Sequence, residues 1–139
     1  MTQAATQFPS FRTISTFFTA GACSASLMHI LDRAFGHPLP AEEEAANPLA
    51  GGIVNNGYQC GMLWGAALAA GAAAYRVHGP GPRAEAAAVT AARRLVARFV
   101  ADNDDSNCLE LTDLDVNRSK WTLVKYLATG GPVACSRRA

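Results

Sequence analysis

Apolar residues recur along the chain with the spacing of helices, and few stretches alternate in the way that strands do. The first series occupies i, i+3 and i+7 positions in the N-terminal segment and consists of Phe11, Ile14 and Phe18. A series of this kind predicts a short amphipathic helix. We therefore expect residues 1–20 to be a helical extension of an all-α protein.

A second helical pattern begins at Ser24 and ends before Gly36, which is followed by two prolines. Asp32 and Arg33 are predicted on its polar face. Its apolar face is predicted to consist of Leu27, Ile30, Leu31 and Ala34. A short acidic helix over residues 41–46 is expected next.

The central pattern predicts a helix over residues 57–76 in which every fourth residue is small. This small-residue stripe consists of Gly57, Gly61, Gly65, Ala69 and Ala73. Because the stripe is almost bare backbone, another helix, a cofactor or a second copy of the chain can approach closely. The uncharged stretch around it holds only about 15 continuous small apolar residues, fewer than the roughly 20 of a membrane-spanning helix. We therefore interpret it as a buried helix.

Two more helices are predicted over residues 85–101 and 115–128, separated by a polar loop. Trp121, Val124 and Leu127 are expected to face inward from the last of them. The length of 139 residues suits one domain, so we expect a single bundle of five or six helices over residues 1–139.

The amino-acid composition of the chain excludes some classes of protein. Half of the residues are apolar and 17% are charged, which is too hydrophobic for intrinsic disorder. A net charge of +1 without a long basic run argues against nucleic acid as a partner. The first ten residues lack the basic start and apolar core of a secretory signal, so we expect a cytoplasmic protein with reduced thiols.

The four cysteines stand one per segment, at Cys23, Cys60, Cys108 and Cys135. The first two fall in the first turn of predicted helices, where the macrodipole favours an anion, so their thiols are expected to ionise easily. The other two follow a loop and a helix stop, and are expected to complete a site from loops. No pair has C-x-x-C spacing, so spacing alone supports neither a zinc site nor a thioredoxin-like motif. Four small core residues are the structural alternative.

The order of the motifs resembles a known family. A first cysteine is followed by Gly51-Gly52, by Cys60-Gly61-Met62-Leu63-Trp64-Gly65, and then by two single cysteines. This arrangement resembles the redox-active proteins named for a C, CGAxxG, C, C signature, over most of the chain from Cys23 to Cys135. Met62 stands where that signature has Ala.

The resemblance implies redox chemistry at the cysteines, and two mechanisms follow. In the first, all four thiolates ligate an iron-sulfur cluster, most simply [2Fe-2S], with Gly61 and Gly65 permitting its close approach and Trp64 shielding it. In the second, an ionised Cys60 or Cys23 attacks a disulfide and a second cysteine resolves the mixed disulfide. Both require a redox partner. A non-catalytic helical adaptor that forms a homodimer through the small-residue stripe is the alternative from another class.

Overall fold

The computed structural model describes Ser15 and residues 21–138, and the predicted helix at Phe11, Ile14 and Phe18 lies outside these residues. The described part of the chain forms seven α-helices and one 3-10 helix, and its only β structure is one isolated bridge. The prediction of an all-α protein is confirmed. The number of helices exceeds the expected five or six because two helices of five and six residues, at Cys108 and Cys135, are too short to give a periodic pattern.

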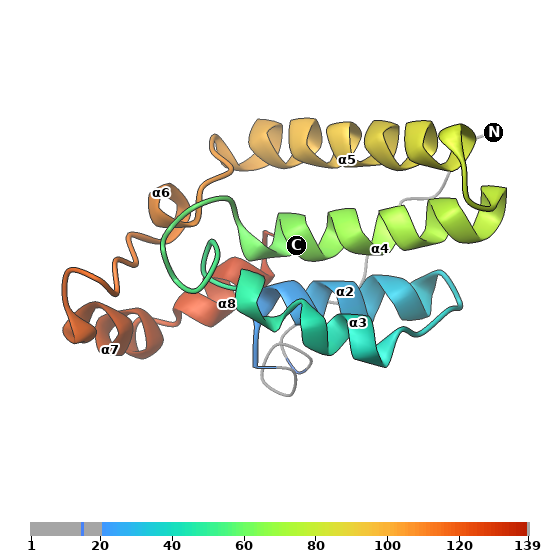
Figure 1. The fold of residues 1–139 in the computed structure, drawn as a ribbon. Helices are drawn as coiled ribbons and strands as arrows, with labels where there is room; N and C mark the ends of the chain where they lie inside the picture. Colours follow the sequence, from blue (N-terminus) through green and yellow to red (C-terminus); the bar gives the residue numbers. More distant parts are fainter. Residues whose placement is uncertain (1–14, 16–20, 139) are drawn as a thin grey trace.

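Three long helices lie side by side (Figure 1). Helix α4 (Gly61–His78) is in the middle and packs against α2 (Cys23–Ala34) on one side and α5 (Pro82–Asn103) on the other. The link between α4 and α5 is short, with left-handed glycines at Gly79 and Gly81. Proline at the first position of α5 fixes the helical backbone where its missing N–H costs nothing. None of the helices in the described residues is long and apolar enough to cross a membrane.

The buried face of α2 agrees only in part with the predicted one, since Leu27 and Leu31 pack against the core clusters but other residues are more deeply buried. Its buried residues are Ser24, Ala25, Ser26, Met28 and Asp32, whereas Ala34 is exposed. The placement of Asp32 on a polar, solvated face was therefore wrong. The two buried serines satisfy their hydroxyls by donating to backbone carbonyls, Ser24 to Ala46 and Ser26 to Ala22. Burial and the nearby charge of Glu43 raise the pKa of Asp32.

Two short elements cover the outer side of α2. These are α3 (Pro40–Ala45) and a 3-10 helix, η1 (Asn47–Leu49). The buried Ser24 hydroxyl donates to the Ala46 carbonyl at 2.6 Å, which ties the start of α2 to this connection. Glu43 receives hydrogen bonds from Arg33 at 2.6 Å and pairs with a ring nitrogen of His29 at 2.7 Å. These bonds explain how Glu43 is tolerated as a buried residue.

The C-terminal helices gather at the end of the bundle where α4 begins (Figure 1). They are α6 (Cys108–Thr112), α7 (Lys120–Ala128) and α8 (Gly131–Ser136). Helix α7 begins at Lys120 rather than near residue 115 because the Ser119 side chain caps it, accepting from the Trp121 amide at 3.2 Å. The prediction that Trp121, Val124 and Leu127 face inward was wrong, since their exposed fractions are 77%, 52% and 56%.

The hydrophobic core is divided along α4 into two clusters. One lies at the start of the helix and contains Cys60, Met62, Leu63 and Cys135. The other lies further along and contains Met28, Ala46 and Ala69. The first cluster contains the cysteines Cys60 and Cys135, so the candidate reactive groups lie at the end of the bundle where α4 begins.

Candidate functional site: a cavity lined by four cysteines

Two of the cysteines meet where α2 and α4 begin. Cys23 is the first residue of α2, and Cys60 is the N-cap of α4, as the sequence predicted. A Cβ atom added to Gly61 would lie 2.6 Å from the Cys23 sulfur and 2.9 Å from the Leu49 carbonyl oxygen, so glycine leaves the space that the thiol and this backbone occupy. The absence of one side chain therefore places the thiol of Cys23 beside the N-terminus of α4.

Cys108 is joined to Cys60 through the backbone. The isolated antiparallel bridge pairs Gln59 with Asn107. On either side of it, the Cys60 amide donates to the Ser106 carbonyl and the Cys108 amide donates to the Tyr58 carbonyl, both at 2.7 Å. Cys108 was expected in a loop, but it is the first residue of α6, whose short turn begins as soon as the bridge ends.

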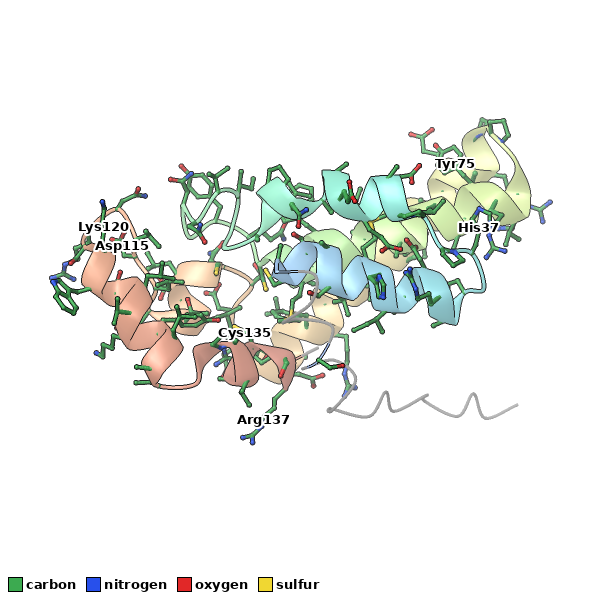
Figure 2. The ribbon with its side chains drawn as sticks, turned by 90° about the horizontal axis from the view of Figure 1, so that it is seen from below. His37, Tyr75, Asp115, Lys120, Cys135 and Arg137 are labelled. Carbon is green, nitrogen blue, oxygen red and sulfur yellow. The ribbon has the colours of Figure 1, made fainter. Side chains whose placement is uncertain are left out.

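Cys135 reaches the site from α8 rather than from the irregular tail that was expected. A left-handed Gly130 (φ 76°) reverses the chain between α7 and α8. The ring of Tyr126 then packs on Gly131, where any Cβ would overlap it. The Tyr126 hydroxyl lies 3.0 Å from the Cys135 sulfur. Figure 2 shows Cys135 where the C-terminal helices meet the long helices.

All four cysteines line one cavity of about 190 Å³. Cys60, Cys108 and Cys135 are buried, Cys23 is half-buried, and all four are free thiols. Apart from the thiols, the wall is largely apolar and includes Met62, Leu111, Leu114 and Leu123. Four sulfur atoms from four separate segments therefore converge on one space.

The expectation that Cys23 and Cys60 ionise easily was wrong. Burial raises the pKa of Cys60 from 9.0 to about 12, although backbone N–H groups of Met62 and Leu63 act in the opposite direction. Burial likewise raises the pKa of Cys23, against a hydrogen bond from the Gly51 backbone. It raises the pKa of Cys108 to about 11. The helix N-terminus does assist the thiolate, but desolvation is the larger effect.

The turn over residues 51–55, which includes Gly51, was not predicted to take part in the site, because it holds no side chain of a kind that ligates metals or reacts. Consecutive residues from Gly51 to Asn55 have positive φ angles, including 61° at Ile53 and 52° at Val54, which is rare for β-branched residues. Strained backbone of this kind persists where surrounding structure holds it, often at functional sites. The signals in the sequence for this turn are the Gly51-Gly52 pair and Asn55, which adopt positive φ more readily than other residues. Tyr126 was also missed, because nothing in its spacing links it to Cys135.

The four thiols do not form a ready-made site for a single metal ion. Within residues 21–138, no three side chains among His, Cys, Asp and Glu lie close enough to hold one ion. A [2Fe-2S] cluster places two cysteines on each iron, so it needs pairs of thiolates rather than three around one centre. The cavity of about 190 Å³ is many times the roughly 10–15 Å³ that one water needs, so it can hold a group of several atoms.

The small-residue stripe packs against another helix of the same chain. A Cβ atom at Gly65 would overlap the Ser24 carbonyl oxygen, and Ala69 is fully buried in the cluster with Met28. Gly57 precedes α4 and does not belong to the stripe. Of the residues expected near a cofactor, Gly61, Gly65 and Trp64 lie outside the set that lines the cavity. The partner of the stripe is α2, so a homodimer would have to use another surface.

A model of the family described as "Putative redox-active protein (C_GCAxxG_C_C)" matches residues 22–136. With Cys60 on the signature cysteine, Met62 falls at a variable position, so the departure expected there was wrong. The departures are Gln59 and Trp64 at the two signature glycines and Gly61 at the alanine, with Gly65 one residue later. Searches of curated proteins and of solved structures found no match.

Proposed function

Since the chain belongs to the redox-active protein family with the C_GCAxxG_C_C signature, we propose that its four cysteines ligate a [2Fe-2S] cluster and that it transfers single electrons. The observation that carries the proposal is the convergence of four free thiols on one cavity. Fe-S clusters are held by four cysteine thiolates, and ligands from four segments surround such a group without crowding.

The high pKa values of the thiols favour ligation over nucleophilic attack. A thiol with a pKa of about 12, such as Cys60, is almost fully protonated near neutral pH and is a poor nucleophile. Metal cations displace the thiol proton and offset the charge of the thiolate, so burial is a smaller obstacle to ligation. The same burial that hinders attack by a free thiolate therefore suits a buried ligand set.

When bound, the cluster would supply one-electron redox chemistry. The chain's own contribution is to hold Cys23, Cys60, Cys108 and Cys135 around one space and to exclude water with apolar side chains. The backbone N–H groups of Gly51, Met62 and Leu63 provide hydrogen bonds to the first two sulfur atoms. Hydrogen bonds to sulfur stabilise negative charge on the ligands and tune the reduction potential. Four free thiols suit a reducing compartment, so we place this chemistry in the cytoplasm.

Thiol-disulfide exchange is the second candidate, and the contact between Tyr126 and Cys135 favours it. A hydroxyl 3.0 Å from sulfur can donate to a thiolate, so Cys135 is better placed to attack than Cys60 or Cys23. Its thiolate would displace one sulfur of a partner disulfide, and a second cysteine would then release the other as a thiol. Two electrons pass to the partner, and an intramolecular disulfide remains.

One preparation distinguishes the two candidates. The full-length protein is purified without oxygen, and its iron, acid-labile sulfide and visible absorption are measured. The proposal expects about two irons and two sulfides per chain. Each single Cys→Ser variant should lose most of them, whereas Val77→Ser, exposed at the far end of α4, should retain them. Colourless protein that titrates as a dithiol would instead establish the second candidate. Unchanged folding without all four cysteines would indicate an adaptor.

A further inference from the structure

The outer face of α7 is apolar and has no partner within the described residues. Helix α7 packs mainly against α8, and none of its residues is buried. Trp121, Val124 and Leu127 follow one another at three-residue intervals, and each has more than half of its surface exposed. Together with Leu123, which is 39% exposed, they form what we call the α7 patch. Contiguous exposed apolar surface of this kind marks interaction sites.

The α7 patch is continuous with the cysteine cavity. Leu123 and Leu127 belong to the patch and also line the cavity wall. Tyr126, one residue before Leu127, contacts the Cys135 sulfur from the inner side of the same helix. Only α7 would therefore separate a molecule bound to the patch from the thiols. Electron exchange with the site requires a short separation of this kind.

The charges around the patch define its partner. From the start of α7 at Lys120 to Arg138 every charged side chain is basic, and the nearest acidic one is Asp115, in the turn before α7, where it accepts from the Arg118 amide at 3.1 Å. The basic set is Arg118, Lys120, Lys125, Arg137 and Arg138. Figure 2 shows Lys120 and Arg137 in this C-terminal part of the molecule, away from His37 and Tyr75 at the opposite end. Two copies that met through this face would bring like charges together, which disfavours a homodimer.

We propose that the α7 patch is the docking surface for an acidic redox protein, which covers Trp121 with apolar side chains and faces the basic rim with carboxylates. This inference rests on the proposed function, because it requires an electron-transfer site behind α7. One electron passes between the two proteins, so that one is oxidised as the other is reduced. A nucleic acid or an anionic membrane would also meet the charge, but neither brings a redox group to the cavity.

The experiment measures binding of full-length protein to a plant-type [2Fe-2S] ferredoxin, chosen as an acidic redox probe, by calorimetry at low and at physiological ionic strength. Trp121→Ala should weaken binding about tenfold or more, because exposed tryptophans at interface centres dominate affinity. Lys125→Glu should weaken it severalfold at low salt and reduce its salt dependence. The matched controls are Val77→Ala and Arg83→Glu, both exposed and at the other end of α4 and α5. They should bind as the original protein does.

Several results would overturn the inference. These are absence of binding to the ferredoxin, equal effects of Trp121→Ala and Val77→Ala, or a Trp121-dependent dimer in sedimentation. Stronger Trp121-dependent binding to anionic lipid vesicles or to DNA than to the ferredoxin would also overturn it. Binding is measured apart from iron content, so the two proposals fail separately. If colourless protein binds the ferredoxin, the cluster proposal alone is refuted. If iron-loaded protein does not bind the ferredoxin, the docking proposal alone is refuted.

Discussion

Replacing Gly65 with alanine should separate α2 from α4. A Cβ atom at this position would overlap the carbonyl oxygen of Ser24 and lie 3.0 Å from the carbonyl carbon and 3.2 Å from the backbone nitrogen of Met28. All three atoms belong to the backbone of α2, so no change of rotamer can remove the overlap. The helix as a whole has to move, and its contacts along α4 loosen with it.

The magnitude follows from two opposing contributions. Overpacking a tight contact costs about 1–3 kcal/mol, occasionally more, and a clash with backbone belongs at the upper end. Alanine is a better helix former than glycine, and this difference offsets about 1 kcal/mol of that cost. We expect Gly65→Ala to lower the free energy of unfolding by about 2 kcal/mol. Domains of this size have about 5–15 kcal/mol in total, so the loss is easily measured.

The same helix provides a matched control at Gly71, where an added Cβ would meet no atom within 4 Å. Gly71→Ala gains helix propensity without overlap and should raise the free energy of unfolding by about 0.5–1 kcal/mol. Urea unfolding followed by circular dichroism measures both variants, with the protein reduced and metal-free so that ligation does not contribute. Equal stabilisation by the two substitutions would refute the close contact between α2 and α4.

Four further predictions concern the cysteine site. Gly61→Ala should reduce iron content by about tenfold, because a Cβ there displaces the Cys23 sulfur 2.6 Å away; iron at the original level contradicts this. In reduced, metal-free protein at neutral pH, Cys60 should be alkylated about a thousandfold more slowly than in unfolded protein, since burial raises its pKa from 9.0 to about 12. For the same reason stability should fall as pH rises from 9 towards 12, where unfolded thiols ionise and the folded thiol does not; a flat profile would exclude the shift. Tyr126→Phe should cost about 1 kcal/mol in urea unfolding by removing the hydroxyl from Cys135, and no loss would show that the contact is not a hydrogen bond.

The sequence was most informative where helix boundaries carry strong local signals. Cys23 and Cys60 stand at the starts of α2 and α4 as predicted, because glycine-containing turns precede both helices and a long series of mostly helix-forming residues follows. The small-residue stripe correctly indicated a close approach. Its partner could not be predicted, since a surface that admits any helix does not specify which helix, and several were available along the chain.

Local patterns failed for features that depend on tertiary structure. Ionisation of Cys60 was predicted from its place at a helix N-terminus, but the controlling effect is burial by segments far away in the sequence. Trp121 was assigned to the core because large aromatic side chains usually bury, and its helical spacing gave no indication that α7 lies at the edge of the molecule. Asp32 was assigned to the polar face from the pattern of α2 alone, which gives no indication that residues of α4 such as Ala69 and Ala72 lie beside it.

The stripe and the cysteine site depend on each other. Gly61 and Gly65 do not line the cavity, so they act on it through their neighbours. Gly65 meets the backbone of α2, and Gly61 meets the Cys23 sulfur and the backbone of residues 49–50. With no side chains at these two positions, the start of α2 lies directly against α4 and Cys23 stands beside Cys60. A cysteine side chain is short, so a shift of α2 by the width of one methyl group is large compared with its reach. The two glycines therefore set the geometry of the site by the close approach that they permit, and their replacement should affect stability and ligation together.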